Sequence, residues 1–209
     1  MVVMRAPTSV RRRSAPVRGF TLIELMVTVA ILVILGTLAA PSLRSFFIRN
    51  TFSSIGNEFN GSVLRARNEA VSKNVCVTMC RSANADSTSA TSPPVCSVNT
   101  NWQTGWIVFM NPECDATLNE PTEGGTQKPE NMILARPAGS TNYTLVSGGA
   151  TKIMFNARGQ TNVAGGSWFQ LNYVPTPSLN TTYGFNVCVD LLGRSRSVPW
   201  SATNTCGSY

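Results

Sequence analysis

A single carboxylate, Glu24, lies inside an otherwise apolar run from Phe20 to Ala40. The run has the length of roughly 20 residues that a helix needs to cross a bilayer. An ionisable group within such a segment is costly in lipid, so its presence indicates a functional role. Five of the 17 basic residues and none of the ten acidic ones precede the run. This asymmetry predicts a cytoplasmic leader and an exported C-terminal part.

The chain has six cysteines and no histidine. Cysteines in an exported chain favour disulfides, of which six cysteines allow about 15 pairings. The spacing of Cys76 and Cys80 is not followed by a second close pair, and there is no histidine to complete a zinc site. Without histidine, Ser-His-Asp and Cys-His catalysis are excluded. We therefore expect no metal, no cofactor and no enzymatic activity.

The disulfide pairing follows from spacing and remains one choice among several. Cys76 and Cys80 fall on one expected strand with their side chains on the same face. Their Cα atoms would be roughly 13 Å apart, so a bond between them is not expected. Cys80–Cys96 would close a Ser/Pro-rich loop, and Cys188–Cys206 would hold the C-terminal tail. Cys76–Cys114 is then left by elimination. Each bridge is expected to contribute about 2–4 kcal/mol.

Two arginines near the C-terminus form the other candidate site, Gly193–Arg196, which we call the basic hairpin. A turn at Leu192-Gly193 would place Arg194 and Arg196 on one face of the following strand, about 6.6 Å apart. That separation is close to the spacing of neighbouring phosphates, and the guanidinium group suits phosphate oxygens. The alternative is a solvated strand edge whose charges prevent aggregation, or an interface with acidic residues of another subunit.

Further residues can support such a site. Lys152 and Arg158 would add positive charge, since the segment 141–209 contains Asp190 as its one acidic residue. Trp200 follows Pro199 and would be able to stack on a base, although a tryptophan is more often part of a core or interface.

The elements that must position these residues begin with one long helix, expected from Thr21 to Ser72. Pro41 should kink this helix without ending it, because apolar residues resume at helical spacing. The domain boundaries expected are a leader over 1–19, a membrane or filament-core segment over 20–41, an amphipathic half-helix over 42–73 and a globular domain over 74–209. The apolar residues at helical spacing after Pro41 form one stripe, which comprises Phe52, Ile55, Phe59, Val63, Ala66 and Ala70.

The globular part has the alternation and turn residues of short strands. Loops are expected over 82–101 and 111–129, which are rich in Ser, Thr, Pro and Gly. The expected strands are Val75–Arg81, Gly105–Met110, Met132–Arg136, Tyr143–Ser147, Lys152–Asn156, Ser167–Tyr173, Tyr183–Leu191 and Arg194–Val198.

The N-terminal sequence Arg18-Gly-Phe-Thr-Leu-Ile-Glu-Leu-Met26 resembles the leader of type IV prepilins and type II secretion pseudopilins. The resemblance implies cleavage between Gly19 and Phe20 by a prepilin peptidase, N-methylation of Phe20, and pairing of Glu24 with the amine of a neighbouring subunit. An ordinary secretory signal, cut near Leu38–Ala40, fits poorly because Pro41 follows directly and the apolar region is long. A twin-arginine signal at 11–13 also fits poorly, because the apolar region that follows is too long for it.

The globular part resembles the GspH/FimT/FimU family of minor pilins and pseudopilins in four segments: Cys76–Cys80, Trp102–Phe109, Ile153–Gly159 and Val187–Arg196. This implies an α+β pilin fold, with a long kinked helix packed on two small antiparallel sheets. The Gly-Arg-x-Arg pattern, carried by Gly193, Arg194 and Arg196, is similar to the DNA-binding motif of FimT-type pilins. Lys152 and Arg158 are outside that motif.

These resemblances imply a minor type IV pilin that enters the pilus, supports assembly and binds double-stranded DNA without sequence preference during natural transformation. The alternatives are an assembly-priming pilin without DNA binding and a type II secretion pseudopilin. The implied partners are other major and minor pilins, the prepilin peptidase and DNA. The implied location is a single pass through the inner membrane with a periplasmic head, followed by the extracellular pilus.

Overall fold

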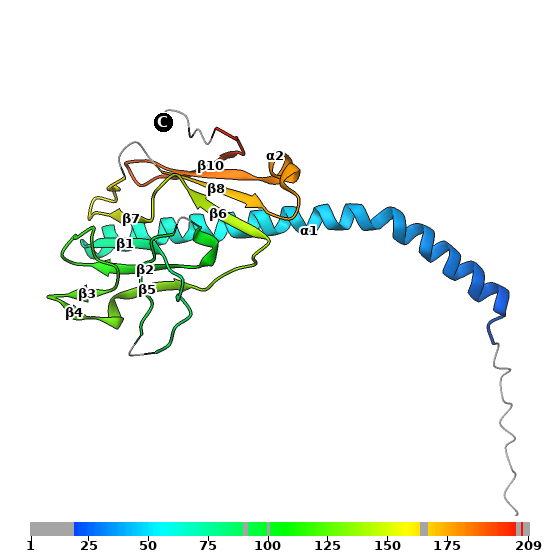
Figure 1. The fold of residues 1–209 in the computed structure, drawn as a ribbon, viewed down its shortest axis with the longest axis horizontal. Helices are drawn as coiled ribbons and strands as arrows, with labels where there is room; N and C mark the ends of the chain where they lie inside the picture. The colour runs from blue at the N-terminus through cyan, green and yellow to red at the C-terminus, as the bar shows by residue number, and fades with distance from the viewer. Residues whose placement is uncertain (1–18, 90–91, 100, 164–166, 204–205, 207–209) are drawn as a thin grey trace, which may run out of the picture. The chain divides into compact units, whose positions relative to one another are not determined.

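The computed structural model describes residues 19–89, 92–99, 101–163, 167–203 and 206 (Figure 1). The chain divides into two compact units, Met1–Ser45 and Phe46–Tyr209. Helix α1 (Leu22–Lys73) contributes to both, and Pro41 lies inside it. The expected helix began at Thr21 and ended at Ser72, so its ends are confirmed to within one residue.

The described part of the first unit is residues 19–45, which are largely apolar and, except for the partly buried Ser45, exposed. Among the helices of the described residues, α1 alone is long and apolar enough to cross a membrane, and none of its most apolar window is buried within the protein. An exposed apolar surface of this extent indicates a segment that lipid or other protein chains cover.

The second unit consists of the rest of α1 and two antiparallel four-stranded sheets. Sheet A has the strand order β5-β2-β1-β7, and sheet B has the order β10-β9-β8-β6. A two-stranded ribbon, β3-β4, completes the strands. This arrangement confirms the expected α+β class with two small antiparallel sheets. The bounds are β1 Cys76–Arg81, β2 Trp106–Asn111, β3 Thr122–Glu123, β4 Thr126–Gln127, β5 Met132–Arg136, β6 Tyr143–Ser147, β7 Lys152–Phe155, β8 Ser167–Tyr173, β9 Phe185–Val189 and β10 Ser195–Pro199.

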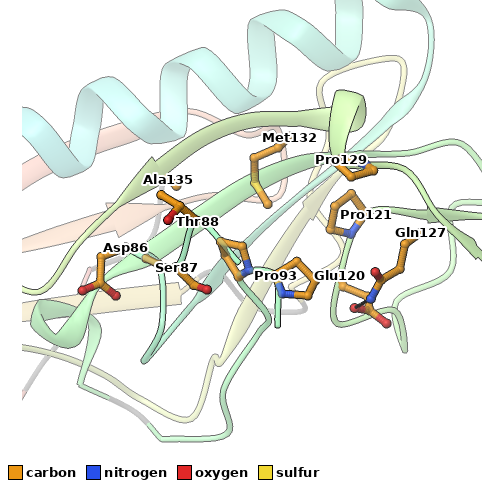
Figure 2. A pocket seen from close by; sticks show the side chains of 12 residues that line it. Asp86, Ser87, Thr88, Pro93, Glu120, Pro121, Gln127, Pro129, Met132 and Ala135 are labelled. Carbon is orange, nitrogen blue, oxygen red and sulfur yellow. Dashed lines mark hydrogen bonds between the residues drawn. The ribbon is translucent and has the colours of Figure 1, made fainter. Parts of the chain in front are cut away.

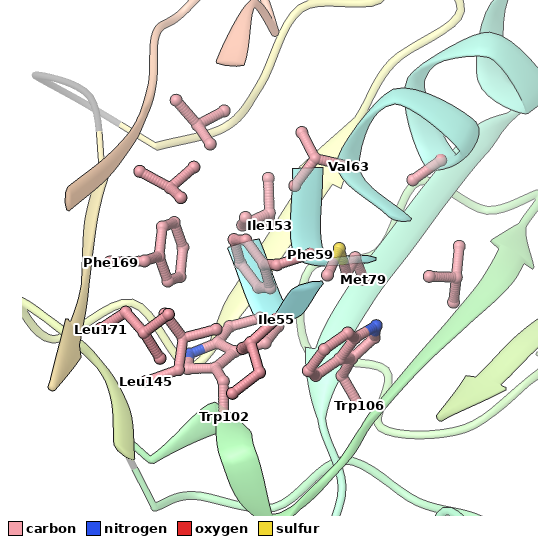
Figure 3. Close-up of a cluster of buried hydrophobic side chains, with 14 of the residues drawn as sticks. Ile55, Phe59, Val63, Met79, Trp102, Trp106, Leu145, Ile153, Phe169 and Leu171 are labelled. Carbon is pink, nitrogen blue, oxygen red and sulfur yellow. The ribbon is translucent and has the colours of Figure 1, made fainter. Parts of the chain in front are cut away.

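The core lies where α1 packs on both sheets. All six residues of the predicted helical stripe are buried, which confirms the periodicity. Phe59 is at the centre, with its ring centroid 5.6 Å from Trp102, 5.5 Å from Trp106 and 4.7 Å from Phe169 (Figure 3). Because Phe169 belongs to sheet B and Trp106 to sheet A, this one side chain joins the helix to both sheets.

The three disulfides connect Cys76 to Cys114, Cys80 to Cys96 and Cys188 to Cys206, the same pairs that the spacing favours. Cys80 also belongs to a second, smaller apolar cluster with Ala85, Ile107 and Phe109. In an antiparallel sheet alternate residues face opposite sides. Val77 and Met79 face the main core, so Cys80 and this second cluster lie on the outer side of sheet A.

Two expectations for the strands were inexact. Residues 111–129 were predicted as a loop but contain the ribbon β3-β4. Tyr183 was predicted to begin a strand but ends a helical turn, α2 (Asn180–Tyr183). The turn is closed by the Gly184 N–H donating to Asn180 O at 2.8 Å, and the Asn180 side chain accepts from the Tyr173 N–H at 2.6 Å. That contact with β8 is tertiary, so local sequence does not reveal it.

Candidate functional site

The predicted processing site lies just before α1. Gly19 and Phe20 are exposed, and an added Cβ on Gly19 would meet nothing within 4 Å. Thr21 caps the helix, since its Oγ1 accepts from the Glu24 N–H at 3.2 Å. A Thr at the N-cap followed three residues later by Glu is the capping-box pattern. The Gly19–Phe20 bond is therefore in accessible, non-helical backbone, while Glu24 is exposed in the first turn of α1.

The basic hairpin begins at a turn that only glycine can form. Gly193 has φ +71°, and an added Cβ would lie 2.1 Å from the backbone oxygen of Gly159. The positive φ disfavours other residues, and the close backbone approach excludes a side chain outright. Gly193 therefore lets the turn between β9 and β10 pack directly on the turn that follows β7.

Asp190 fixes both the turn and Arg194. Its Oδ1 accepts from the Arg194 N–H at 2.7 Å, and its Oδ2 forms an ion pair with Arg194 Nε at 2.7 Å. The Asp190 side chain is 5% exposed, whereas that of Arg194 is 61% exposed. Burial opposes ionisation, yet the hydrogen bonds and the charge of Arg194 hold the pKa of Asp190 below its ordinary value. The aspartate therefore remains charged and orients the arginine at the surface.

A third cation, Arg67 of α1, joins this site. Its Nε donates to Gly159 O at 3.2 Å and to Leu192 O at 3.3 Å, so it connects the two turns. Sequence reasoning does not find Arg67, because a helical pattern shows only that it lies outside the apolar stripe of α1. A hint was available in its position one residue after the buried Ala66.

The other predicted residues differ in their surroundings. Arg158 is exposed on the turn 156–160, which packs on Gly193 through the backbone oxygen of Gly159. Arg196 is exposed on β10, and its guanidinium donates to the Cys206 backbone oxygen. Trp200 is partly buried and donates from Nε1 to Asn172 Oδ1 at 2.8 Å, which fits the interpretation as a packing residue. Arg194 precedes β10, so only Arg196 of the pair is within the strand.

Lys152 does not support the basic hairpin, which corrects the expectation for this residue. Its Nζ donates to the backbone oxygens of Ala116, Thr117 and Leu118 at 2.8–3.1 Å. Desolvation lowers the pKa of its ammonium group. Lys152 is paired with Cys80 at the edge of sheet A, where it stabilises a loop.

Three arginines therefore belong to or contact the two packed turns, namely Arg67, Arg158 and Arg194, and Arg196 follows on β10. Exposed guanidinium groups held by backbone and carboxylate contacts are suited to bind phosphate oxygens. No group of three or more side chains able to hold a metal ion occurs among the described residues.

Comparison with known proteins shows which family the chain resembles. The sequence profile of a family described as type II transport protein GspH matches residues 56–193, and that of the prokaryotic N-terminal methylation motif matches residues 15–40. No curated protein matches the sequence significantly. Two crystal structures of the type IV minor pilin FimU from Pseudomonas aeruginosa PAO1 are similar in fold. One has a TM-score of 0.50 at 16% identity, covering 74% of this chain and 92% of that chain.

The other FimU structure has a TM-score of 0.46 at 15% identity and covers 70% of this chain and 92% of that chain. The GspH match spans more than half of the 209 residues and includes the part of α1 that packs on the sheets, both sheets as far as β9, and Gly193. With the methylation motif preceding it, the chain belongs to the GspH family.

Proposed function

We propose that this GspH-family protein is a type IV minor pilin, which is cleaved between Gly19 and Phe20, is held in the inner membrane with its head in the periplasm, and then enters a type IV pilus. Support comes from the accessible Gly19–Phe20 bond, the exposed apolar part of α1 and the methylation motif. Glu24 pairs with the new N-terminal amine of a neighbouring subunit in this proposal. Its position in the first turn of α1 leaves the carboxylate available.

We further propose that the head binds double-stranded DNA through the basic hairpin. The observation that carries this is the pair Asp190–Arg194, in which a buried carboxylate orients an exposed guanidinium through Nε. The terminal amino groups of the guanidinium are then left for a phosphate. Arg67 and Arg158 add charge at the same place, whereas Lys152 does not. Binding through backbone phosphates has no sequence preference and weakens steeply with salt.

The test is DNA binding by the full mature chain in nanodiscs of zwitterionic lipid. Fluorescence anisotropy with a labelled duplex is measured over a salt series for the parent and for R194Q/R196Q. A single subunit with two to four phosphate contacts should bind with a Kd of about 10⁻⁴–10⁻⁶ M, and each lost contact should reduce the log–log salt slope by about 0.9. We expect the double variant to bind at least tenfold more weakly, with a slope reduced by about 2.

The matched control is K73Q/K128Q, which removes the same charge from two exposed ion pairs with Glu69 and Glu130. It should change binding less than threefold. Equal losses of affinity in both double variants would mean that DNA binding depends only on net charge. No binding by the parent at 50 mM salt would contradict the DNA proposal.

A second role for the same surface has its own observation. Leu191 and Leu192, at the tip of the turn, are 50% and 49% exposed. Exposed apolar side chains beside arginines also suit a contact with another pilin. If the parent does not bind DNA and Leu191→Ser/Leu192→Ser impairs pilus assembly, the assembly role replaces the DNA role. Loss of exported enzymes without loss of pili would instead indicate a type II secretion pseudopilin.

A further inference from the structure

A pocket of about 310 Å³ lies on the outer side of sheet A (Figure 2). Its walls come from the loop after β1, the segment before the ribbon β3-β4, and strand β5. We call it the proline pocket, because four of its lining residues are prolines. The apolar lining is Ala85, Pro93, Pro94, Pro121, Pro129, Met132 and Ala135.

The walls of the proline pocket are held by covalent and backbone bonds. The disulfide Cys80–Cys96 ties the first loop to β1. Asn84 fixes the same loop, since its Nδ2 donates to Pro93 O and its Oδ1 accepts from the Val95 N–H, both at 3.0 Å. The Cys96 N–H donates to Asn119 O at 2.6 Å and so joins the two loops. A pocket fixed in this way is formed before any partner arrives, which reduces the entropy lost on binding.

Charge distinguishes this pocket from an ordinary apolar hollow. Asp86 and Glu120 line it together with the prolines, and Figure 2 shows them at different ends of the apolar surface. Glu120 is positioned by Gln127, whose Nε2 donates to its Oε2 at 2.7 Å. The surrounding segment 82–130 contains six acidic residues and Lys128 as its single basic one. An occupant must therefore bring positive charge to both ends and an apolar group between them.

We propose that the proline pocket binds a segment of another protein in which a large apolar side chain is flanked by Lys or Arg. The volume is at the low end for ligand sites, enough for one or two side chains. The prolines and Met132 provide the apolar contact, and the two carboxylates pair with the flanking cations. The pocket shares no residue with the basic hairpin, so this proposal does not depend on DNA binding.

The test uses the full mature chain in zwitterionic nanodiscs and three synthetic peptides, GRLRG, GELEG and GRSRG. Saturation-transfer NMR reports contact between protein and peptide, with empty nanodiscs subtracted. We expect transfer to the leucine methyl groups of GRLRG that is at least threefold stronger than for GELEG. GRSRG should show less transfer than GRLRG, because its serine does not fill the apolar centre.

Variants locate the contact. Ala135→Trp places a large side chain in the pocket from an exposed position of β5, so the fold should tolerate it, and transfer should fall to the empty-nanodisc value. Asp86→Asn/Glu120→Gln should reduce transfer at least threefold. The matched control, Glu123→Gln/Glu130→Gln, removes the same charge from residues that do not line the pocket and should retain more than half of the signal. Circular dichroism checks that each variant is folded.

Three results would overturn the proposal. Saturation transfer to GELEG as strong as to GRLRG would show that the carboxylates do not select the peptide. An unchanged signal in Ala135→Trp would place binding elsewhere. The third is the absence of peptide binding together with concentration-dependent self-association that Ala135→Trp abolishes. The occupant would then be a second copy of this chain, presenting its Leu191–Arg194 turn.

Discussion

At the scale of single residues, Gly193 meets two constraints, a positive φ and a close approach to the backbone of Gly159, and substitutions can distinguish their contributions. Gly193→Ala imposes a positive φ on a residue with a Cβ and also forces that Cβ against Gly159 O. We expect a loss of unfolding free energy of about 2–4 kcal/mol from the combined strain and overlap. Urea denaturation followed by tryptophan fluorescence measures it.

Gly124 provides the matched control. It also has a positive φ, +59°, but an added Cβ would meet nothing within 4 Å. Gly124→Ala should therefore cost only about 1 kcal/mol, the part that comes from backbone conformation. If both variants lose the same free energy of unfolding, the close approach to Gly159 does not contribute to the cost of substitution.

Asp190 makes stability depend on pH with a defined sign. Its pKa in the folded state lies below the ordinary value of about 3.9 that we expect after unfolding. Its contribution is therefore complete above that ordinary value and is lost as pH falls through the lower, folded value. Asp190→Asn keeps an acceptor for the Arg194 N–H but removes the charge, so we expect a loss of about 1–2 kcal/mol at pH 7.

The measurement is urea denaturation of the parent and Asp190→Asn at pH 7, 5 and 3. The difference between the two should be constant between pH 7 and 5 and should shrink toward pH 3. Asp86→Asn, at an exposed position, is the control and should change stability by less than about 0.5 kcal/mol. A difference that grows as the solution is acidified would contradict the assigned direction.

At the scale of elements, two glycines of α1 have opposite roles. Gly56 is buried, and an added Cβ would lie 2.0 Å from the ring of Phe185 in β9, so Gly56 permits close packing of α1 on sheet B. Gly61 is exposed, with nothing within 4 Å. We expect Gly56→Ala to destabilise the head by about 1–3 kcal/mol through overpacking.

Gly61→Ala serves as the internal comparison, because alanine has the higher helix propensity and meets no obstacle. It should raise the unfolding free energy by about 0.5–1 kcal/mol. The midpoints of thermal unfolding should therefore move in opposite directions. A stabilised Gly56→Ala would mean that the Phe185 ring moves aside without loss of packing.

At the scale of the whole molecule, the proposed pairing of Glu24 with a neighbouring subunit predicts that assembly depends on its carboxylate. Glu24→Ala should leave cleavage largely intact but reduce the amount of the protein in sheared pili at least tenfold, since the carboxylate for the neighbouring amine is lost. Glu24→Asp, which keeps the charge, should recover part of that amount. Immunoblots of pilus and membrane fractions measure both, and normal incorporation of the alanine variant would remove the pairing from the proposal.

Much of the fold was predictable because its signals are local. The stripe from Phe52 to Ala70 has helical spacing, and every member is buried. Eight strands were expected and occur close to the predicted bounds, because alternation and turn residues are also local patterns. Tyr183 is the exception with a physical cause, since the side chain of Asn180 accepts a hydrogen bond from β8 and holds a helical turn there.

The sequence by itself determined the leader pattern, the single carboxylate in the apolar segment, the long helix and the most plausible cysteine pairs. These depend on composition and on spacing along one element. Only the tertiary structure decided which charges meet. It brings Arg67 from α1 to the turns at Gly159 and Leu192, directs Lys152 to a loop of sheet A, and pairs Arg194 with buried Asp190. The contacts of Arg67 join residues 92 and 125 positions apart, and that of Lys152 with Leu118 joins residues 34 positions apart, so no periodicity along one element encodes them.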